Sequence, residues 1–189
     1  MRHALLVVTV CLTGCFFDIR GGAVAPTQHG FGNLGGQFVA SSGGDGRTPF
    51  GRAGGGLSAY GHLASDGAGD IFGWAGGALH GRVEVNLKHL WYRYPEGNAV
   101  TFRKTIISLT TLAVGVGRIG GDAPESTMFV DAFSGIGVST RNPGRLRWFS
   151  WAVGAVANRL WPDSSDGAWF VGLALAGSAG YELGKAPPL

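Results

Sequence analysis

Two cysteines, Cys11 and Cys15, supply the thiol groups of this 189-residue chain. A pair of cysteines can form a disulfide, hold part of a metal site or act as a nucleophile. Both lie at the end of an apolar run, residues 4–10, that follows Arg2 and His3. A basic segment, an apolar segment and then small residues are the order of a secretory signal peptide, and the run is too short to cross a bilayer as a helix.

The tetrapeptide LTGC, residues 12–15, ends this signal-like segment. It resembles the lipobox of bacterial lipoproteins, in which the cysteine sulfur is acylated and the chain is cut just before that cysteine. The resemblance implies a signal peptide over residues 1–14, a lipid on Cys15 and loss of Cys11 with the signal. Glycines and a proline interrupt the next stretch, FFDIRGGAVAPTQHG, so we expect residues 15–30 to form a lipidated N-terminus and a flexible tether.

Three histidines, His62, His80 and His89, lie in the body of the chain. On a strand, His80 and Glu84 would lie about 13 Å apart, too far for a direct hydrogen bond, and His80 and His89 would point to opposite faces. His62 and Ser65 run into a turn cluster, and no glycine string precedes Gly-Lys-Ser/Thr as in a phosphate loop. We therefore expect no catalytic, cofactor-binding or metal-binding residues, and a protein that is not an enzyme.

The composition is unusual for a soluble domain. Glycine supplies 35 of the 189 residues and charged residues only 14%, against roughly 7% glycine and about 25% charged residues in typical proteins. The 6 Trp, 11 Phe and 4 Tyr argue against a disordered linker. The formal net charge is +3 without any basic run, so we expect no nucleic-acid partner. The length indicates one domain.

Clusters of turn-forming residues divide the chain into short apolar segments. The longest apolar runs are shorter than the roughly 20 residues that a spanning helix needs, but long enough for a tilted spanning strand. The segments predict strands at residues 31–42, 53–64, 71–79, 82–94, 99–119, 126–140, 145–161 and 168–184. The break near residue 80 rests on the glycines of GGALHG, because one strand from 71 to 94 would be unusually long.

The stretch HGRVEVNLKHLW, which begins at His80, gives the clearest alternation of polar and apolar residues. Its polar face carries four residues besides the histidine, which we call the polar ladder: Arg82, Glu84, Asn86 and Lys88. The last segment differs, because both of its faces are apolar or small before Glu182, and neither suits the solvent side of a soluble sheet. An apolar outer face backed by small residues fits a narrow transmembrane barrel.

We therefore predict an all-β fold, an antiparallel up-and-down β-barrel of about eight strands over residues 31–184, with a tail at 185–189. In this pattern the domain resembles the small outer-membrane β-barrel proteins. The polar ladder would fill the lumen and close it rather than open a pore. Aromatic residues toward strand ends would form girdles at the two membrane surfaces: Trp91, Trp148, Trp161, Trp169 and Tyr181.

An even number of strands returns both termini to one side of the barrel, which the resemblance places in the periplasm. The short connections PEGN, residues 95–98, and RNPG, residues 141–144, would lie on that side. The connections at 41–49, 120–126 and 162–167 would lie on the outside.

Together these features predict a non-enzymatic outer-membrane lipoprotein, a structural or envelope-interaction component held by membrane lipid through the acylated Cys15. Its arginine-rich loops would meet lipopolysaccharide or another envelope protein. The alternative is a soluble, lipid-anchored barrel, similar to lipocalins, that holds an apolar ligand. An enzyme acting on envelope lipids is a third possibility, for which the sequence offers no catalytic arrangement.

Overall fold

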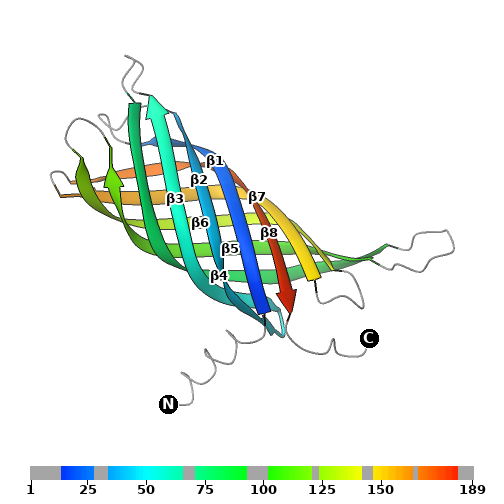
Figure 1. The fold of residues 1–189 in the computed structure, drawn as a ribbon. Helices are drawn as coiled ribbons and strands as arrows, with labels where there is room; N and C mark the ends of the chain where they lie inside the picture. Colours follow the sequence, from blue (N-terminus) through cyan, green and yellow to red (C-terminus); the bar gives the residue numbers. More distant parts are fainter. Residues whose placement is uncertain are drawn as a thin grey trace.

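The computed structural model describes residues 14–27, 34–65, 71–92, 102–120, 124–141, 147–163 and 166–182. Its strands pair antiparallel in sequence order, and the last strand pairs with the first, so that the sheet closes into a barrel (Figure 1). The predicted all-β barrel of eight strands is confirmed. Among the described residues, no helix is long and apolar enough to cross a membrane.

The strands vary in length because the barrel is sheared and one hairpin is longer than the rest. They are β1 (Gly14–Pro26), β2 (Gly35–Thr48), β3 (Gly51–Ser65), β4 (Ile71–Tyr92), β5 (Phe102–Ile119), β6 (Glu125–Arg141), β7 (Arg147–Pro162) and β8 (Ala168–Glu182). Beyond Val85, β4 has no partner in β3 and pairs only with β5, so this hairpin projects past the rim (Figure 1).

The predicted tether over residues 15–30 is wrong for most of its length, because residues 14–26 form strand β1. Main-chain pairing to β2 on one side and to β8 on the other holds this glycine-containing segment extended. Its side chains do alternate, with Phe16 and Arg20 buried and Phe17 and Ile19 exposed. Residues 28–30 lie outside the described residues.

The predicted strands 71–79 and 82–94 are one strand, β4, which is 22 residues long. The glycines of GGALHG do not break it, because glycine lets a barrel strand bend and leaves space for bulky neighbours. A Cβ on Gly76 would lie 2.9 Å from Cε1 of Phe129, and a Cβ on Gly115 of β5 would lie 2.7 Å from Cζ of the same ring. The missed first strand and the false division compensate, so the predicted number of strands is nevertheless correct.

Two rims result from the up-and-down order. We call the rim where β1 begins and β8 ends the termini rim, and the opposite one the far rim (Figure 1). Strand direction places the β4–β5 and β6–β7 connections at the termini rim. It places the connections near residues 120–124 and 163–167 at the far rim. Each of these connections is therefore on the side of the barrel, relative to the termini, that the sequence predicts. The connection predicted at 41–49 is misplaced, because β2 continues to Thr48 and turns at Pro49 and Phe50 on the termini rim. The additional strand β1 accounts for this reversal.

Candidate functional site

An ion cluster at Arg82 crosses the barrel interior nearest the termini rim. The Arg82 side chain is fully buried, and its Nη1 donates to Oδ1 of Asp18 at 2.9 Å while its Nη2 donates to Oε2 of Glu84 at 3.2 Å. The Ser150 hydroxyl donates to the same Glu84 oxygen at 3.2 Å. The guanidinium carbon also lies 5.1 Å from the ring centroid of Trp148. Arg82 is thus held by two carboxylates and an aromatic face, which is the form in which buried charge is tolerated.

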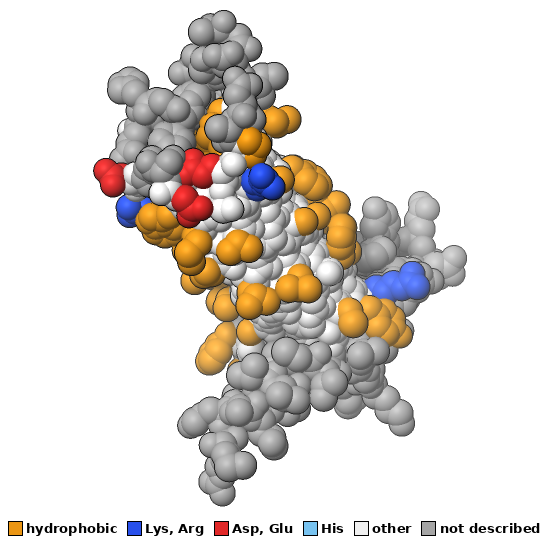
Figure 2. All heavy atoms as spheres, turned by 60° about the vertical axis from the view of Figure 1, so that its left-hand side comes forward, with side chains coloured by type: hydrophobic (Ala, Val, Ile, Leu, Met, Phe, Trp, Pro, Cys, Tyr) orange, Lys and Arg blue, Asp and Glu red, His pale blue; other side chains and the backbone are white. Residues whose placement is uncertain are grey.

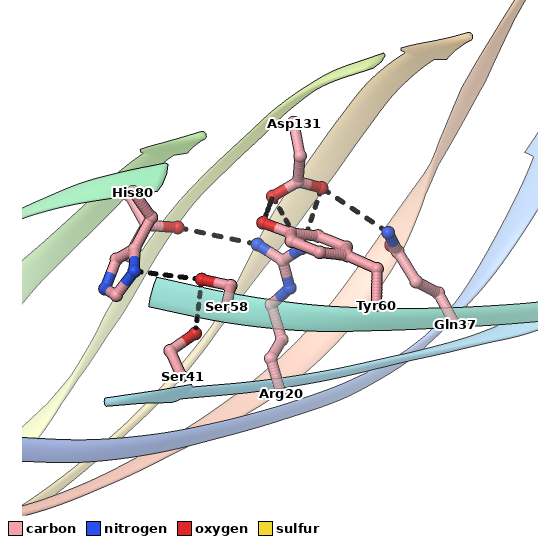
Figure 3. A network of polar contacts seen from close by, with 8 residues as sticks. Arg20, Gln37, Ser41, Ser58, Tyr60, His80 and Asp131 are labelled. Atoms are coloured by element: carbon pink, nitrogen blue, oxygen red, sulfur yellow. Dashed lines mark hydrogen bonds and ion pairs between the residues drawn. The ribbon is translucent and has the colours of Figure 1, made fainter. Parts of the chain in front are cut away.

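A second cluster forms around Asp131, deeper in the barrel (Figure 3). Nη2 of Arg20 donates to both carboxylate oxygens of Asp131 at 2.7 Å, and the Tyr60 hydroxyl donates to Oδ2 at 3.2 Å. Nε2 of Gln37 lies 3.5 Å from Oδ1. Four strands, β1, β2, β3 and β6, therefore meet at one carboxylate across the lumen. The arrangement ties opposite walls together.

A chain of hydroxyls and imidazole lies between the two ion clusters. Oγ of Ser41 is 2.9 Å from Oγ of Ser58, which is 2.9 Å from Nδ1 of His80 (Figure 3). A serine beside a histidine has the elements of a nucleophile and its base. All three side chains are buried, however, and the adjoining cavity has a volume of only about 20 Å³, room for about one water molecule. This environment favours a structural role.

Aromatic side chains fill the lumen toward the far rim. Trp74 and Tyr60 each place a ring centroid 4.8 Å from that of Phe129, and His62 lies 5.0 Å from Phe170. The His62 ring is almost completely buried among these rings. His62 is therefore part of the packed core, and the side chain of Ser65 lies outside the described residues. Ion clusters and aromatic rings together block the lumen at successive levels, as in narrow eight-stranded barrels.

The polar ladder is divided by an irregularity in β4. Arg82 and Glu84 are buried in the lumen and bonded to each other, and Asn86 lines its mouth. Lys88 does not belong to this face, because the register shifts between Asn86 and Lys88 and reverses the alternation. Lys88 consequently pairs with outward-facing Ile106 and is exposed.

The same bulge turns His89, for which the sequence predicts the face opposite His80, to the inward-facing side of β4, where it lines the mouth of the barrel. It pairs with inward-facing Thr105, and its Nδ1 lies 3.2 Å from Oγ1 of that threonine. A single inserted residue, Leu87, is enough for this change, and nothing in the local alternation of the sequence reveals it.

A polar cavity of about 250 Å³ opens at the termini rim, and we call it the mouth cavity. Its floor is formed by Arg52 and Glu84, and its rim by exposed residues of the β2–β3 turn. It is lined by Arg47, Thr48, Pro49, Gly51, Arg52, Glu84, Asn86, His89, Thr105, Ser139 and Arg141. The sequence predicted arginine-rich loops but did not reveal that Arg47, Arg52 and Arg141 converge.

Cys15 is the second residue of β1 and lies at the termini rim. Its side chain is exposed, and its cross-strand neighbours are Gly44 and Tyr181. A thiol at this place has no second cysteine within the described residues. Those residues also contain no group of three or more His, Cys, Asp or Glu side chains that could hold a metal ion.

The outer face of the barrel is apolar between the rims (Figure 2). On β7 the outward-facing charges are Arg147 at one end and Arg159 at the other, and on β5 they are Lys104 and Arg118. Between these positions every outward-facing residue of the described strands is uncharged except Lys88, which lies on the part of β4 that projects past the rim. Acidic side chains gather at the upper, far rim in Figure 2.

Three of the predicted girdle residues, Trp161, Trp169 and Tyr181, are exposed near strand ends. Trp148 is not a girdle residue, because it faces the lumen and its ring lies 4.0 Å from the guanidinium carbon of Arg52. Its even position in β7 places it on the inward face, whereas the outward positions of that strand are odd. The side chain of Trp91 lies outside the described residues.

Comparison of the chain with models of known protein families and with curated protein sequences gives no match in either case.

Proposed function

We propose that this protein is a lipid-anchored outer-membrane protein whose closed barrel spans the bilayer, and that it acts as a non-enzymatic structural or envelope-interaction component. The observation that carries the proposal is the distribution of charge. Ion pairs lie inside the barrel, whereas the outer wall is uncharged from rim to rim. A soluble domain has the opposite arrangement, and large contiguous apolar patches are rare on soluble monomers.

The height of the uncharged wall supports a bilayer as its surroundings. Arg147 and Arg159 lie 12 residues apart on β7, which corresponds to about 40 Å along a strand at roughly 3.3 Å per residue. A strand tilt of about 40° reduces this to a height of about 30 Å. Outer-membrane barrels carry an apolar band about 25 Å high, so both arginines would reach the head-group level.

The interior argues against a lipocalin-like carrier. An apolar ligand needs an apolar cavity, but the small central cavity adjoins Asp18 and Arg20, and the mouth cavity is lined by arginines and hydroxyls. Placing a hydrocarbon chain there would strip water from charged groups without offering them new hydrogen bonds, which is costly. A barrel that spans the bilayer is therefore better supported than a soluble, lipid-anchored carrier.

The position of Cys15 is compatible with a lipid anchor. Its outward-facing side chain lies at the rim beside Tyr181, where acyl chains on the sulfur would enter the bilayer along the barrel wall. Because β1 begins at this point, the lipid would be attached directly to the barrel and not through a tether. The termini rim would then face the periplasm, as in other outer-membrane barrels.

The far rim would face outward and could meet lipopolysaccharide or another envelope protein. Arg159 lies there with its guanidinium carbon 4.9 Å from the ring centroid of Trp161 and 5.5 Å from that of Trp169. An arginine stacked between interfacial aromatics is well placed to bind phosphate groups at the head-group level. Arg118, exposed at the end of β5, is a second arginine at this rim, beside the acidic side chains that gather there.

A Cys15→Ala form tests the proposal. We expect this form to remain in the outer-membrane fraction, to require detergent for extraction and to migrate differently on gels before and after heating, because the wall alone holds it in the bilayer. A freely soluble Cys15→Ala protein would contradict the spanning barrel. Recovery of a bound lipid from that soluble protein would instead establish the lipocalin-like alternative.

A further inference from the structure

The far rim carries an arginine that is held against two tryptophans. Arg159 is half-buried on the outward face of β7, and its guanidinium carbon lies 4.9 Å from the ring centroid of Trp161 and 5.5 Å from that of Trp169. Within the described ranges of the chain, no carboxylate forms an ion pair with Arg159, and its Nε, which solvent does not reach, lacks a hydrogen-bond acceptor. A cation held in this way can bind an anion.

The two rings orient the guanidinium of Arg159 before any ligand binds. Trp169 is its directly opposed neighbour on β8, and Trp161 follows two residues later on the same face of β7. Because the stacked guanidinium is already restrained, less side-chain freedom is lost when its planar fork of N–H groups binds two oxygens of a phosphate. Arg118 at the same rim is exposed and contacts no aromatic ring of the described strands, so it lacks this orientation.

Short side chains lie on the wall between Arg159 and the middle of the barrel. The next outward residues of β7 in that direction are Ala157 and Ala155, and their partners on β6 are Ala132 and Ser134. On the other side, the partner of Ala155 on β8 is a large and exposed leucine. A hydrocarbon chain can approach the sheet backbone closely over the short side chains, so an anion that carries an acyl chain fits this place better than a free ion.

Acidic side chains lie beyond Arg159, in the connection of the same hairpin. Asp163 follows the end of β7 and Asp166 precedes β8, and both are exposed. Neither forms an ion pair within the part of the chain that the structure describes. From the middle of the wall outward, the charge of this hairpin therefore changes from positive to negative. A head group with its phosphate next to the acyl chains and an ammonium group farther out has the complementary order of charges.

We propose that the β7–β8 hairpin binds one zwitterionic phospholipid at the far rim. Its phosphate contacts Arg159 between the two tryptophans, and its ammonium group faces Asp163 and Asp166. One of its acyl chains lies over the short side chains of β6 and β7. This site rests on the bilayer-spanning barrel proposed above, because only a wall that lies in a bilayer meets acyl chains. It goes further in assigning a lipid of defined charge to particular side chains.

Calorimetric titration of the purified full-length protein in detergent with dihexanoyl phosphatidylethanolamine tests the site. Arg159→Gln removes the phosphate-binding group, and the matched control Arg118→Gln removes the same charge from the same rim. We expect the control to bind this lipid as wild type does, and Arg159→Gln to bind it about tenfold more weakly, since a hydrogen bond between charged groups contributes at least about tenfold. A heat-shifted gel band verifies that each variant is folded. If Arg159→Gln does not fold, Arg159→Lys replaces it and should also weaken binding, because lysine keeps the charge but loses the bidentate fork.

Dihexanoyl phosphatidylglycerol, which has the phosphate but no ammonium group, tests the part of the two aspartates. We expect wild type to bind it about two- to fivefold more weakly than the ethanolamine lipid, because exposed charge pairs contribute little. The double variant Asp163→Asn with Asp166→Asn should bind the two lipids equally.

Three results would overturn the site: a folded wild-type protein that does not bind the ethanolamine lipid, an equal loss in the Arg159 and Arg118 variants, or a lipid preference that persists in the aspartate variant. Equal or tighter binding of the glycerol lipid by wild type would also overturn it, and would assign Arg159 to anionic lipids such as lipopolysaccharide. None of these results contradicts the spanning barrel, which is tested separately by whether the Cys15→Ala protein requires detergent.

Discussion

Removal of the Asp131 carboxylate should be among the most damaging single changes to this barrel. In an Asp131→Ala protein, Arg20 keeps its charge in a nearly buried position but loses both of its 2.7 Å hydrogen bonds. The Tyr60 hydroxyl loses its acceptor at the same time. Breaking a buried ion pair from one side costs about 3–5 kcal/mol, and a buried unsatisfied hydroxyl adds about 1–3 kcal/mol. Since the two terms overlap, we expect a loss of about 4 kcal/mol in the free energy of unfolding.

A double-mutant cycle separates the interaction energy of the Arg20–Asp131 pair from the contributions of the two residues taken singly. Arg20→Met alone leaves the Asp131 charge without its cation and should cost about 3–5 kcal/mol. The combination of Arg20→Met with Asp131→Leu removes both charges and fills the space, so that only the Tyr60 and Gln37 groups lose a partner. Its expected cost is about 1–2 kcal/mol, far below the sum of the single changes.

Urea unfolding of the protein folded in lipid vesicles, followed by tryptophan fluorescence and by the heat-shifted gel band, measures these free energies. Ser134→Ala, on the outward face of the same strand β6, is the control and should change stability by less than about 0.5 kcal/mol. Additive single changes, or an Asp131→Ala cost below about 1 kcal/mol, would refute the view that this buried pair ties the barrel walls together.

Two further substitutions examine packing and the outer face. Gly115→Ala should cost about 1–3 kcal/mol in the same unfolding assay, because its Cβ would lie 2.7 Å from the Phe129 ring. The control Gly21→Ala should be nearly neutral, because its Cβ would meet nothing within 4 Å. Equal costs for the two substitutions would contradict the packing argument. Val153→Arg, at the middle of the uncharged wall on β7, should lower the free energy of unfolding in vesicles by about 2–4 kcal/mol. Trp161→Arg, at the rim, should lower it by about 0–1 kcal/mol. A cost that does not depend on position would argue against a bilayer around the wall.

Much of the fold follows from local alternation in the sequence. In β6, Phe129 and Phe133 face inward and Met128 and Ile136 outward, as a period of two requires. Strand β1 was missed because its glycines mask a short alternation of inward-facing and outward-facing side chains. The segment becomes a stable strand only through pairing with β2 and β8. The division of β4 failed for the converse reason, since Gly76 accommodates Phe129 and the glycines of this strand do not form a turn.

The interior site was less predictable. Arg82 and Glu84 could be assigned to one face from their spacing, but the bulge that expels Lys88 and admits His89 depends on pairing with β5. The Arg20–Asp131 pair joins residues 111 positions apart, and only barrel closure and register bring them together. The convergence of Arg47, Arg52 and Arg141 has the same origin, because their strands meet at one rim.

Collision accessibility of spin labels along β7 tests the central claim, that the outer wall lies in hydrocarbon. Labels are placed singly at positions 147, 153 and 159 of a Cys11→Ala, Cys15→Ala protein folded in lipid vesicles. Because residue 153 faces outward midway between the two arginines, the bilayer account predicts that its label collides with oxygen but not with a water-soluble nickel chelate, whereas the labels at 147 and 159 meet the chelate. Ready collision of the chelate with the label at 153 would contradict a membrane-spanning barrel.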